Sequence, residues 1–331
     1  MKRLAALGLV CIMVVMLAAC GKGEAKNNTG ASDKPASTAA NTDKNTEAAS
    51  GETRTVKYLD KEYTVPANVK RIVITGSMES MEDALVLDVH PVGAITFGGK
   101  FPERFAGITA EATPIGEKTQ PNFETILSLK PDVILGSTKF KPEVAEQLSK
   151  IGTLIQVSHI ATDWEANLQL LGELTGKQEQ AQKAIAEYKS GLDEAKAKLG
   201  DKLKDKKVVA VRVRTGKMYI YPEKVFFNPV LYGDLGLTVP AEIKAAKAQE
   251  ELSVEKFAEM NPDYLFIQYA DDENKDTPNA LKELQNNPII QKTNAVKEGH
   301  AFVNVIDPLS EGGPAWSRSE FLKAAVENLS K

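Results

Sequence analysis

The chain has 331 residues, with 41 Lys and Arg against 45 Asp and Glu, and a formal net charge of −4 at pH 7. This length allows about one to three domains, and 42% hydrophobic with 26% charged residues is typical of a soluble globular body. The net acidic charge gives no indication of nucleic acid as a partner, because phosphate binding requires a surplus of basic side chains.

The N-terminus has the composition of a targeting segment. Two basic residues precede an apolar run over 4–16, which is too short for an ordinary transmembrane span. The residues LAAC over 17–20 resemble the cleavage box of bacterial lipoproteins, in which the cysteine becomes the lipidated N-terminus. We therefore expect a signal peptide over 1–20 and a lipid anchor at Cys20, on the extracytoplasmic face of the bacterial cell membrane. The alternative is a plain secretory signal with a chance cysteine.

The next segment, over 21–54, is expected to be a flexible linker. It consists mainly of Lys, Asn, Thr, Ser, Ala, Asp and Glu, with almost no large apolar side chain. Such a segment cannot bury enough surface to offset the entropy lost on ordering. We interpret it as a tether that holds the folded part off the membrane.

A first α/β lobe is expected over 55–165. Alternation around Asp60-Lys61 predicts a hairpin over 55–65, and a helical pattern occupies 79–87. Short apolar runs predict strands at 71–75, 91–95, 132–135 and 154–157. Strands that alternate with helices favour a mainly parallel sheet.

A long helical connector is expected over 166–204. Leu, Ala, Ile and Tyr recur there at spacings of three and four among charged residues, which is typical of an amphipathic helix. An interruption at Gly176 stays open, and the segment contains no strand pattern.

A second α/β lobe is expected over 205–331. Its predicted strands and terminal helix lie at 208–214, 218–221, 264–269, 301–305 and 314–329. The sequence therefore predicts the α/β class, with two Rossmann-like lobes joined by a single long helix.

An internal repeat supports the division into two lobes. The segment 122–135 matches 253–266, and each copy has a helix-capping residue, a short helix, Pro-Asp and an apolar strand. Glu124 and Glu255 occupy the same place in the two copies, in the first helical turn. A carboxylate there is stabilised by the helix dipole by about 0.3–1 kcal/mol, which is one explanation. The other is that one exposed acid per lobe docks onto a two-fold partner.

Arg212 and Arg214 indicate an anion beside the second lobe's first strand. Residues two positions apart on a strand share a face, and the valines of 208–214 fill the opposite face. Two guanidiniums on one face of a central strand require an anion. The alternative is an edge strand with a solvated face.

The sequence supports a role in ligand binding for one of three candidate lysines and not for the other two. Lys139 follows the strand over 132–135, and open α/β sheets bind ligands beyond the carboxyl ends of their strands. Lys118 and Lys247 have no such support, so the residues alone favour ordinary surface lysines.

Motifs for catalysis and metal binding are absent from the sequence. His90, His159 and His300 are far apart, and no group of His, Cys and carboxylates has metal-ligand spacing. There is no Gly-x-Ser-x-Gly, His-Glu-x-x-His or phosphate-binding glycine loop. Ser253 and Lys256 fit Ser-x-x-Lys, but Ser253 is better explained as a helix cap. We expect no enzymatic activity, no cofactor of the protein's own and no protein-built metal site.

Taken together, the lipoprotein box, the two lobes, the helical connector and the repeated Glu and Pro-Asp units resemble cluster III substrate-binding proteins of ABC importers. This resemblance covers 55–331 and implies a periplasmic-binding-protein fold of class III. Seven segments are similar to members that bind a ferric tris-catecholate siderophore of the bacillibactin or enterobactin type: 75–83, 116–118, 137–140, 212–214, 231–237, 244–249 and 271–274.

The resemblance also implies functional residues. The ligand-binding set falls on Lys118, Lys139, Arg212, Arg214 and Lys247, and the permease-docking acids fall on Glu124 and Glu255. The siderophore supplies every iron ligand, so the protein needs cations around a trianion rather than metal ligands. Thr215 stands where the tris-catecholate-binding members have glutamine, so the resemblance does not extend to a ligand contact at this position.

The implied partners are the ferric siderophore, the permease subunits and, through them, an ATPase, with the protein itself a monomer. The rival ligands are a ferric hydroxamate or carboxylate siderophore, haem and cobalamin. A metal-ion binding protein and an extracellular hydrolase are more distant rivals, disfavoured by the missing histidines and motifs.

Overall fold

The computed structural model describes residues 51–331, which belong to one compact unit. The signal peptide expected over 1–20, the lipidation site Cys20 and nearly all of the linker expected over 21–54 lie outside the described residues. Strand β1 (Thr53–Tyr58) begins within the last two positions of that linker. In the part that the structure describes, no helix is long and apolar enough to span a membrane.

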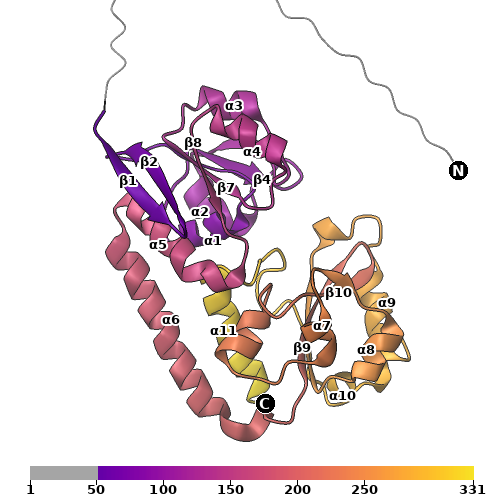
Figure 1. Ribbon diagram of the computed structural model, residues 1–331. Coiled ribbons are helices and arrows are strands. Elements are labelled where there is room, and N and C mark those ends of the chain that lie inside the picture. The colour runs from indigo at the N-terminus through magenta and orange to yellow at the C-terminus, as the bar shows by residue number, and fades with distance from the viewer. Residues whose placement is uncertain (1–50) are drawn as a thin grey trace, which may run out of the picture. The chain divides into compact units, whose positions relative to one another are not determined.

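The first lobe contains a hairpin and a six-stranded sheet (Figure 1). In the hairpin, β1 pairs antiparallel with β2 (Lys61–Pro66), as predicted. The sheet order is β6 (Gln120–Pro121), β5 (Thr113–Glu117), β4 (Gly93–Thr96), β3 (Ile72–Ile74), β7 (Val133–Ser137) and β8 (Thr153–Val157). Only β5 and β6 pair antiparallel, which confirms the mainly parallel sheet. The strand order reverses between β3 and β7, and ligands bind at such switch points.

Helices cover the first sheet and continue into the connector. The first lobe has α1 (Met78–Leu87), η1 (Glu103–Phe105), α2 (Ala106–Thr109), α3 (Phe123–Ser128), α4 (Pro142–Ser149) and η2 (Ala161–Asp163). The connector has α5 (Trp164–Thr175), α6 (Gln178–Leu199) and η3 (Gly200–Leu203). Gly176 separates α5 from α6 with φ 72°, a left-handed conformation in which glycine carries no steric penalty.

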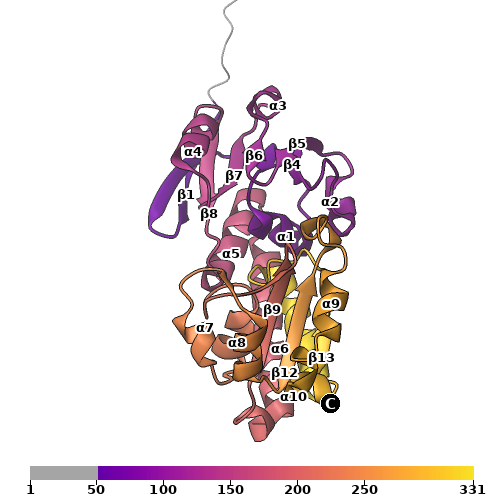
Figure 2. The same cartoon turned by 90° about the vertical axis from the view of Figure 1, so that its right-hand side faces the viewer.

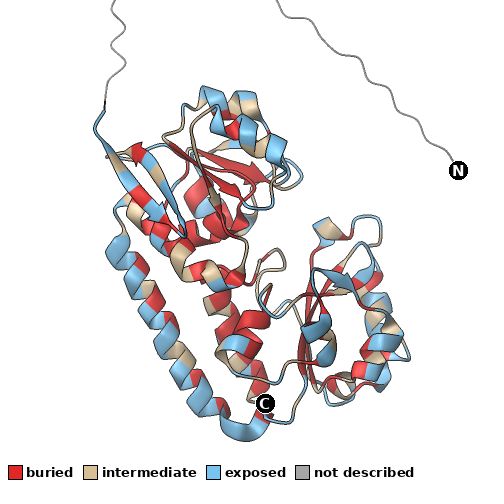
Figure 3. Ribbon diagram, viewed as in Figure 1, coloured by how far each residue is buried: buried red, intermediate tan, exposed pale blue. Residues whose placement is uncertain are grey.

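The long helix α6 runs alongside the folded body and has one buried face (Figures 1 and 3). Its buried residues include Ala181, Ile185 and Tyr188, at the helical spacing that the sequence shows. A helix of 22 residues is about 33 Å long. The helix therefore connects the lobes as one rigid element.

The second lobe has a mixed sheet of five strands (Figure 2). The order is β11 (Glu250–Glu251), β10 (Lys217–Ile220), β9 (Val208–Arg214), β12 (Tyr264–Tyr269) and β13 (Ala301–Val303). Strands β9, β12 and β13 are parallel, whereas β10 and β11 are antiparallel. The helical segments are the π-helical η4 (Pro229–Asp234), α7 (Ala241–Ala245), α8 (Val254–Met260), η5 (Asp271–Glu273), α9 (Ala280–Asn286), η6 (Ile290–Lys292), α10 (Asn294–Lys297) and α11 (Ala315–Leu329).

The two copies of the repeat have the same local structure. The Oδ2 atom of Asp132 accepts hydrogen bonds from the backbone N–H groups of Lys70 and Arg71, at 2.7 and 2.8 Å. In the second lobe, Oδ2 of Asp263 accepts from the N–H of Lys207 at 2.9 Å. Each Pro-Asp unit therefore fixes the start of the neighbouring parallel strand, which is β3 in one lobe and β9 in the other.

The terminal helix α11 joins the second lobe to the connector. It packs against α6, α1 and α5. Its fully buried Phe321 stacks on Phe227, with ring centroids 4.1 Å apart, and meets Phe266 of β12 edge-on at 5.3 Å. Aromatic contacts thus fix α11 against the second sheet.

We expect Phe321→Ala to lower the free energy of unfolding by about 3–5 kcal/mol, because the substitution leaves a cavity that the packed rings cannot fill. Urea unfolding followed by circular dichroism measures this change. Lys323→Ala on the same helix, where the side chain is 74% exposed, is the matched control and should change stability little. Equal effects of the two substitutions would contradict this account of α11.

Candidate ligand-binding site

Basic residues from both lobes line one cavity of about 140 Å³. Lys118 follows β5, Lys139 follows β7, and Arg212 and Arg214 lie in the carboxyl-terminal half of β9. The carboxyl ends of strands in open α/β sheets are where ligands bind. Four of the five basic residues implied by the resemblance are therefore brought together, although they span nearly a hundred positions of the sequence.

The fifth basic residue, Lys247, does not line this cavity. It is exposed in the segment between α7 and β11, and its backbone N–H donates to Oε1 of Glu250 at 3.0 Å. Gln249, two positions further on, does line the cavity. Thr215 lies outside it, exposed in the turn after β9 with φ 48°.

The two arginines on β9 share one acidic partner, Glu273. The Arg212 side chain is 7% exposed, and its Nε and Nη2 atoms donate to the Glu273 carboxylate at 2.8 and 2.9 Å. Arg214 Nη2 lies 2.9 Å from the same carboxylate, and its Nη1 donates to Oε1 of Gln249 at 3.0 Å. Because β9 is the central strand of its sheet, the edge-strand explanation of the arginines is wrong. The anion beside them is an internal one.

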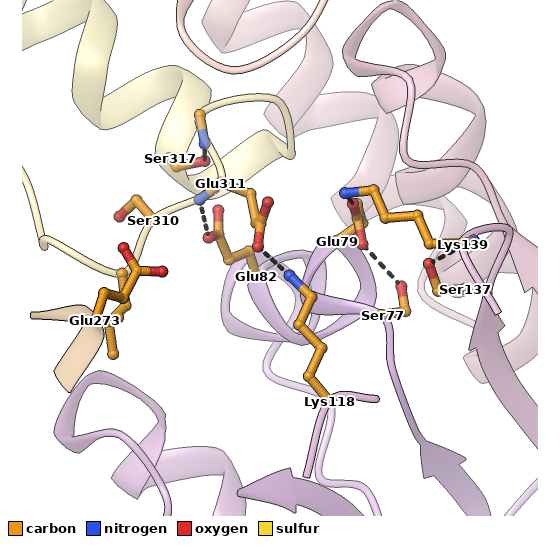
Figure 4. Close-up of polar contacts among 12 residues, drawn as sticks. Ser77, Glu79, Glu82, Lys118, Ser137, Lys139, Glu273, Ser310, Glu311 and Ser317 are labelled. Atoms are coloured by element: carbon orange, nitrogen blue, oxygen red, sulfur yellow. Dashed lines mark hydrogen bonds and ion pairs between the residues drawn. The ribbon is translucent and has the colours of Figure 1, made fainter. Parts of the chain in front are cut away.

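The lysines of the first lobe also face carboxylates (Figure 4). Lys118 Nζ donates to Oε1 of Glu311, in the segment before α11, and Lys139 Nζ lies 3.9 Å from Oε1 of Glu79 on α1. The Lys118 and Lys139 side chains are 28% and 44% exposed. Both lysines thus line the cavity with their ammonium groups facing acids of the protein.

The charges of the site change the pKa values of its acids. Burial favours the neutral form of Glu311, but Lys118, Lys139 and Arg212 outweigh it and hold the pKa of this carboxyl well below its usual range. Burial, and next the charge of Glu311, raises the pKa of Glu79. At neutral pH the cavity therefore holds the ionised carboxylate of Glu311 among its cations.

Two further buried acids of α1 connect the lobes. Glu82 Oε1 accepts from the backbone N–H of Glu311 at 2.9 Å and lies 3.4 Å from Nη2 of Arg104. Asp83 Oδ1 accepts from the N–H of Ala315, the first residue of α11, at 3.2 Å. Burial raises the pKa of Glu82 to about 7 and that of Asp83 well above its ordinary value. The contact between α1 and the start of α11 thus depends on titratable groups.

Glu124 and Glu255 occupy matching exposed positions in the first turns of α3 and α8. The caps are Asn122, which accepts from a backbone N–H at 3.1 Å, and Ser253, which accepts at 3.2 Å. Neither glutamate side chain takes part in an ion pair or side-chain hydrogen bond with another residue of 51–331. The caps account for the helix starts, and both carboxylates stay accessible.

Among residues 51–331, no group of three or more His, Cys, Asp and Glu is arranged to hold a metal ion. No single-residue pattern in the sequence marks the acids that line the cavity, Glu273 and Glu311. Glu273 falls in a segment that carries the family resemblance, whereas Glu311 lies before two glycines and a proline with no pattern that marks it.

Two α/β lobes with a basic cavity between the carboxyl ends of their strands define a two-lobed binding protein. The chain belongs to the periplasmic binding protein family, whose model matches residues 73–304. It is 51% identical over 331 residues to the iron-uptake system-binding protein of Bacillus subtilis (strain 168), covering 100% of both chains.

Solved structures agree with this assignment. The triscatecholate siderophore binding protein FeuA from Bacillus subtilis, complexed with ferri-bacillibactin, matches with a TM-score of 0.81 and 56% identity over 83% of this chain and 98% of that one. The catecholate-siderophore binding protein VctP from Vibrio cholerae matches with a TM-score of 0.67 and 19% identity over 83% and 98% of the chains. The likeness to VctP concerns the fold alone.

The raised pKa of Glu82 predicts a dependence of stability on pH. The folded protein retains a proton that the unfolded chain loses near pH 4.5, so this stabilising contribution is present at low pH and is lost as pH rises through about 7. Glu82→Gln mimics the protonated acid at every pH. We expect the unfolding free energy of this variant, relative to wild type, to rise between about pH 4.5 and 7 by on the order of 1–3 kcal/mol.

Urea unfolding at several pH values measures that difference. Glu194→Gln, on the exposed face of α6, is the control and should show a difference that is flat with pH. A flat difference for Glu82→Gln as well would contradict the role of this carboxyl.

Proposed function

We propose that the protein captures a ferric tris-catecholate siderophore of the bacillibactin or enterobactin type between its lobes and delivers it to the permease of an ABC importer. The observation that carries this proposal is the convergence of Lys118, Lys139, Arg212 and Arg214 on one cavity. Such a ligand is a trianion whose iron is already fully coordinated by catecholate oxygens. Guanidinium and ammonium groups bind anionic oxygens through charge-assisted hydrogen bonds.

The ligand needs more room than the basic cavity offers. Small-molecule sites usually have volumes of about 300–1,000 Å³, against about 140 Å³ here. A neighbouring cavity of about 450 Å³ shares Phe97 and Leu309 with it, and Phe101, Lys100 and Lys275 also line that cavity. Aromatic rings and ammonium groups suit catechol rings. We place the ligand across both cavities.

Lys247 completes the ligand-binding set in this proposal. Its segment is exposed and lies next to Gln249, which already contacts Arg214. A local movement of that segment brings the ammonium group toward the bound anion. Thr215, at the tip of its turn, is left out of the set.

Docking to the permease uses Glu124 and Glu255. The two acids occupy equivalent places in the two lobes, which suits a permease built of two subunits. Leu127, one helical turn after Glu124, is 59% exposed and adds an apolar contact beside the carboxylate. An ATPase then powers transport.

The same proposal covers the membrane attachment. The protein is anchored through Cys20 after cleavage just before this cysteine, tethered by 21–54, and acts as a monomer with lobes over 55–165 and 205–331 joined through 166–204. It acts by binding and release rather than by catalysis. A neutral ferric hydroxamate or cobalamin fits less well, because it offers no negative charge that could replace the carboxylates facing the cations.

Ligand binding is tested with the soluble fragment from about residue 51 by tryptophan fluorescence. Ferric bacillibactin, a neutral ferric hydroxamate and haem are titrated side by side. We expect tight quenching by the catecholate alone, weakened about tenfold or more by Lys139→Ala, because a charge-assisted hydrogen bond is lost. Because Lys139 makes only a long 3.9 Å contact with Glu79, we expect this variant to keep the fold.

Lys183→Ala on α6 is the matched control, since the side chain is 76% exposed and remote from the cavity, and it should bind like wild type. Binding of haem or the hydroxamate alone would remove the tris-catecholate assignment while leaving the fold and the family intact.

Docking is tested by iron uptake in cells that carry the matching permease. We expect the double substitution Glu124→Ala with Glu255→Ala to abolish uptake and leave ligand affinity unchanged, because both carboxylates lie outside the cavity. Glu143→Ala removes a first-turn acid from α4 and is the control, with uptake retained. Uptake that survives the double substitution would contradict the docking role of the two acids.

A further inference from the structure

Glu311 places an anion at the centre of the basic site. Its carboxylate contacts Lys118, and the charges of Lys139 and Arg212 also lower its pKa. The same side chain lines the basic cavity and a second small cavity that reaches Lys139 and Glu79. Figure 4 shows the Lys118 ammonium group directed at this carboxylate. The position against Lys118 is therefore one that an anionic ligand would have to take.

The backbone around Glu311 fixes where its carboxylate points. The N–H of Glu311 donates to Glu82 at 2.9 Å, and the next N–H, that of Gly312, donates to Oγ of Ser317 at 3.0 Å. Gly312 has φ 80°, and a Cβ atom there would lie 2.5 Å from the Phe227 ring. Only glycine fits at this position. The segment is thus anchored on both sides of the cavity-facing side chain.

Glu311 differs from the other acid of the cavity, Glu273. Glu273 holds Arg212 through two hydrogen bonds and also contacts Arg214, so its removal would leave a buried guanidinium without a partner. Glu311 contacts one lysine that is 28% exposed. The single contact is the one that a ligand can replace without separating Glu273 from the buried guanidinium of Arg212.

We propose that Glu311 is an internal competing anion that keeps the basic cavity closed to small inorganic anions and gives way only to a ligand whose negative charge reaches all the cations. A small anion that displaces the carboxylate exchanges one anion contact for another and gains little. A trianion that spans the site gains contacts with Lys139, Arg212 and Arg214 as well. The catecholate part of this inference rests on the proposed function, whereas the exclusion of small anions does not.

The test uses Glu311→Gln, which keeps the size of the side chain and removes its charge. In phosphate-free buffer we expect this variant to bind ferric bacillibactin about tenfold more tightly than wild type, because one repulsive charge and one competitor are gone. Millimolar inorganic phosphate, at constant ionic strength, should weaken binding by the variant and leave wild type unchanged. Glu194→Gln makes the same change in net charge on exposed α6 and should behave like wild type in both respects.

A second readout needs no siderophore. Phosphate alone should raise the melting temperature of Glu311→Gln and leave that of wild type and Glu194→Gln unchanged. Glu311→Asp keeps the charge but shortens the reach to Lys118, and it should show part of the phosphate effect even if the glutamine variant folds poorly.

Weaker or unchanged catecholate binding by a folded Glu311→Gln, or equal phosphate sensitivity in variant and wild type, would overturn the inference. If wild type binds no catecholate while phosphate stabilises only the Glu311 variants, the proposed ligand is wrong and the exclusion of small anions stands.

Discussion

The bidentate contact between Arg212 and Glu273 is the constraint on which the site depends. A guanidinium with a 7% exposed side chain on a central strand requires an anion, whether or not a ligand is present. Glu273 meets that need from η5, the turn that follows β12, and also contacts Arg214. The first lobe follows the same rule, with Glu311 beside Lys118. An acidic chain can therefore present a basic cavity, because each cation is positioned by an acid of the protein itself.

The segment that carries Glu311 also joins the lobes. The backbone N–H of Glu311 donates a hydrogen bond to Glu82 of α1, while the Glu311 carboxylate accepts one from Lys118. The Asp83 carboxylate accepts a hydrogen bond from the backbone N–H of Ala315, the first residue of α11. Phe321 of the same helix packs into the second lobe. A ligand that displaces the Glu311 carboxylate thus acts on a segment that belongs to the contact between α1 and α11. The short stretch 311–315 therefore carries both a cavity-facing carboxylate and the backbone groups that bind α1.

The fold was largely predictable from sequence, and the acids of the site were not. Apolar periodicity located most strands, the connector and α11, and the repeat around Asp132 and Asp263 indicated two lobes because it records a local hydrogen-bonding rule. The two-residue strands β6 and β11 are too short for any periodic signal. Glu82 and Glu311 carry the residue type of an ordinary solvated acid, and only tertiary packing makes them partners.

For the basic residues, too, the sequence predicted the local geometry but not the tertiary partner. The alternation on β9 predicted that Arg212 and Arg214 share a face and meet an anion, since both follow from strand geometry. It could not predict that the anion belongs to the chain. That difference matters for the proposed ligand, because a cavity of free cations would attract any anion, whereas cations that already face Glu273 and Glu311 favour a ligand whose charge exceeds that of the one carboxylate it displaces. In the proposed site, selectivity is set as much by the internal acids as by the lysines and arginines that line the cavity.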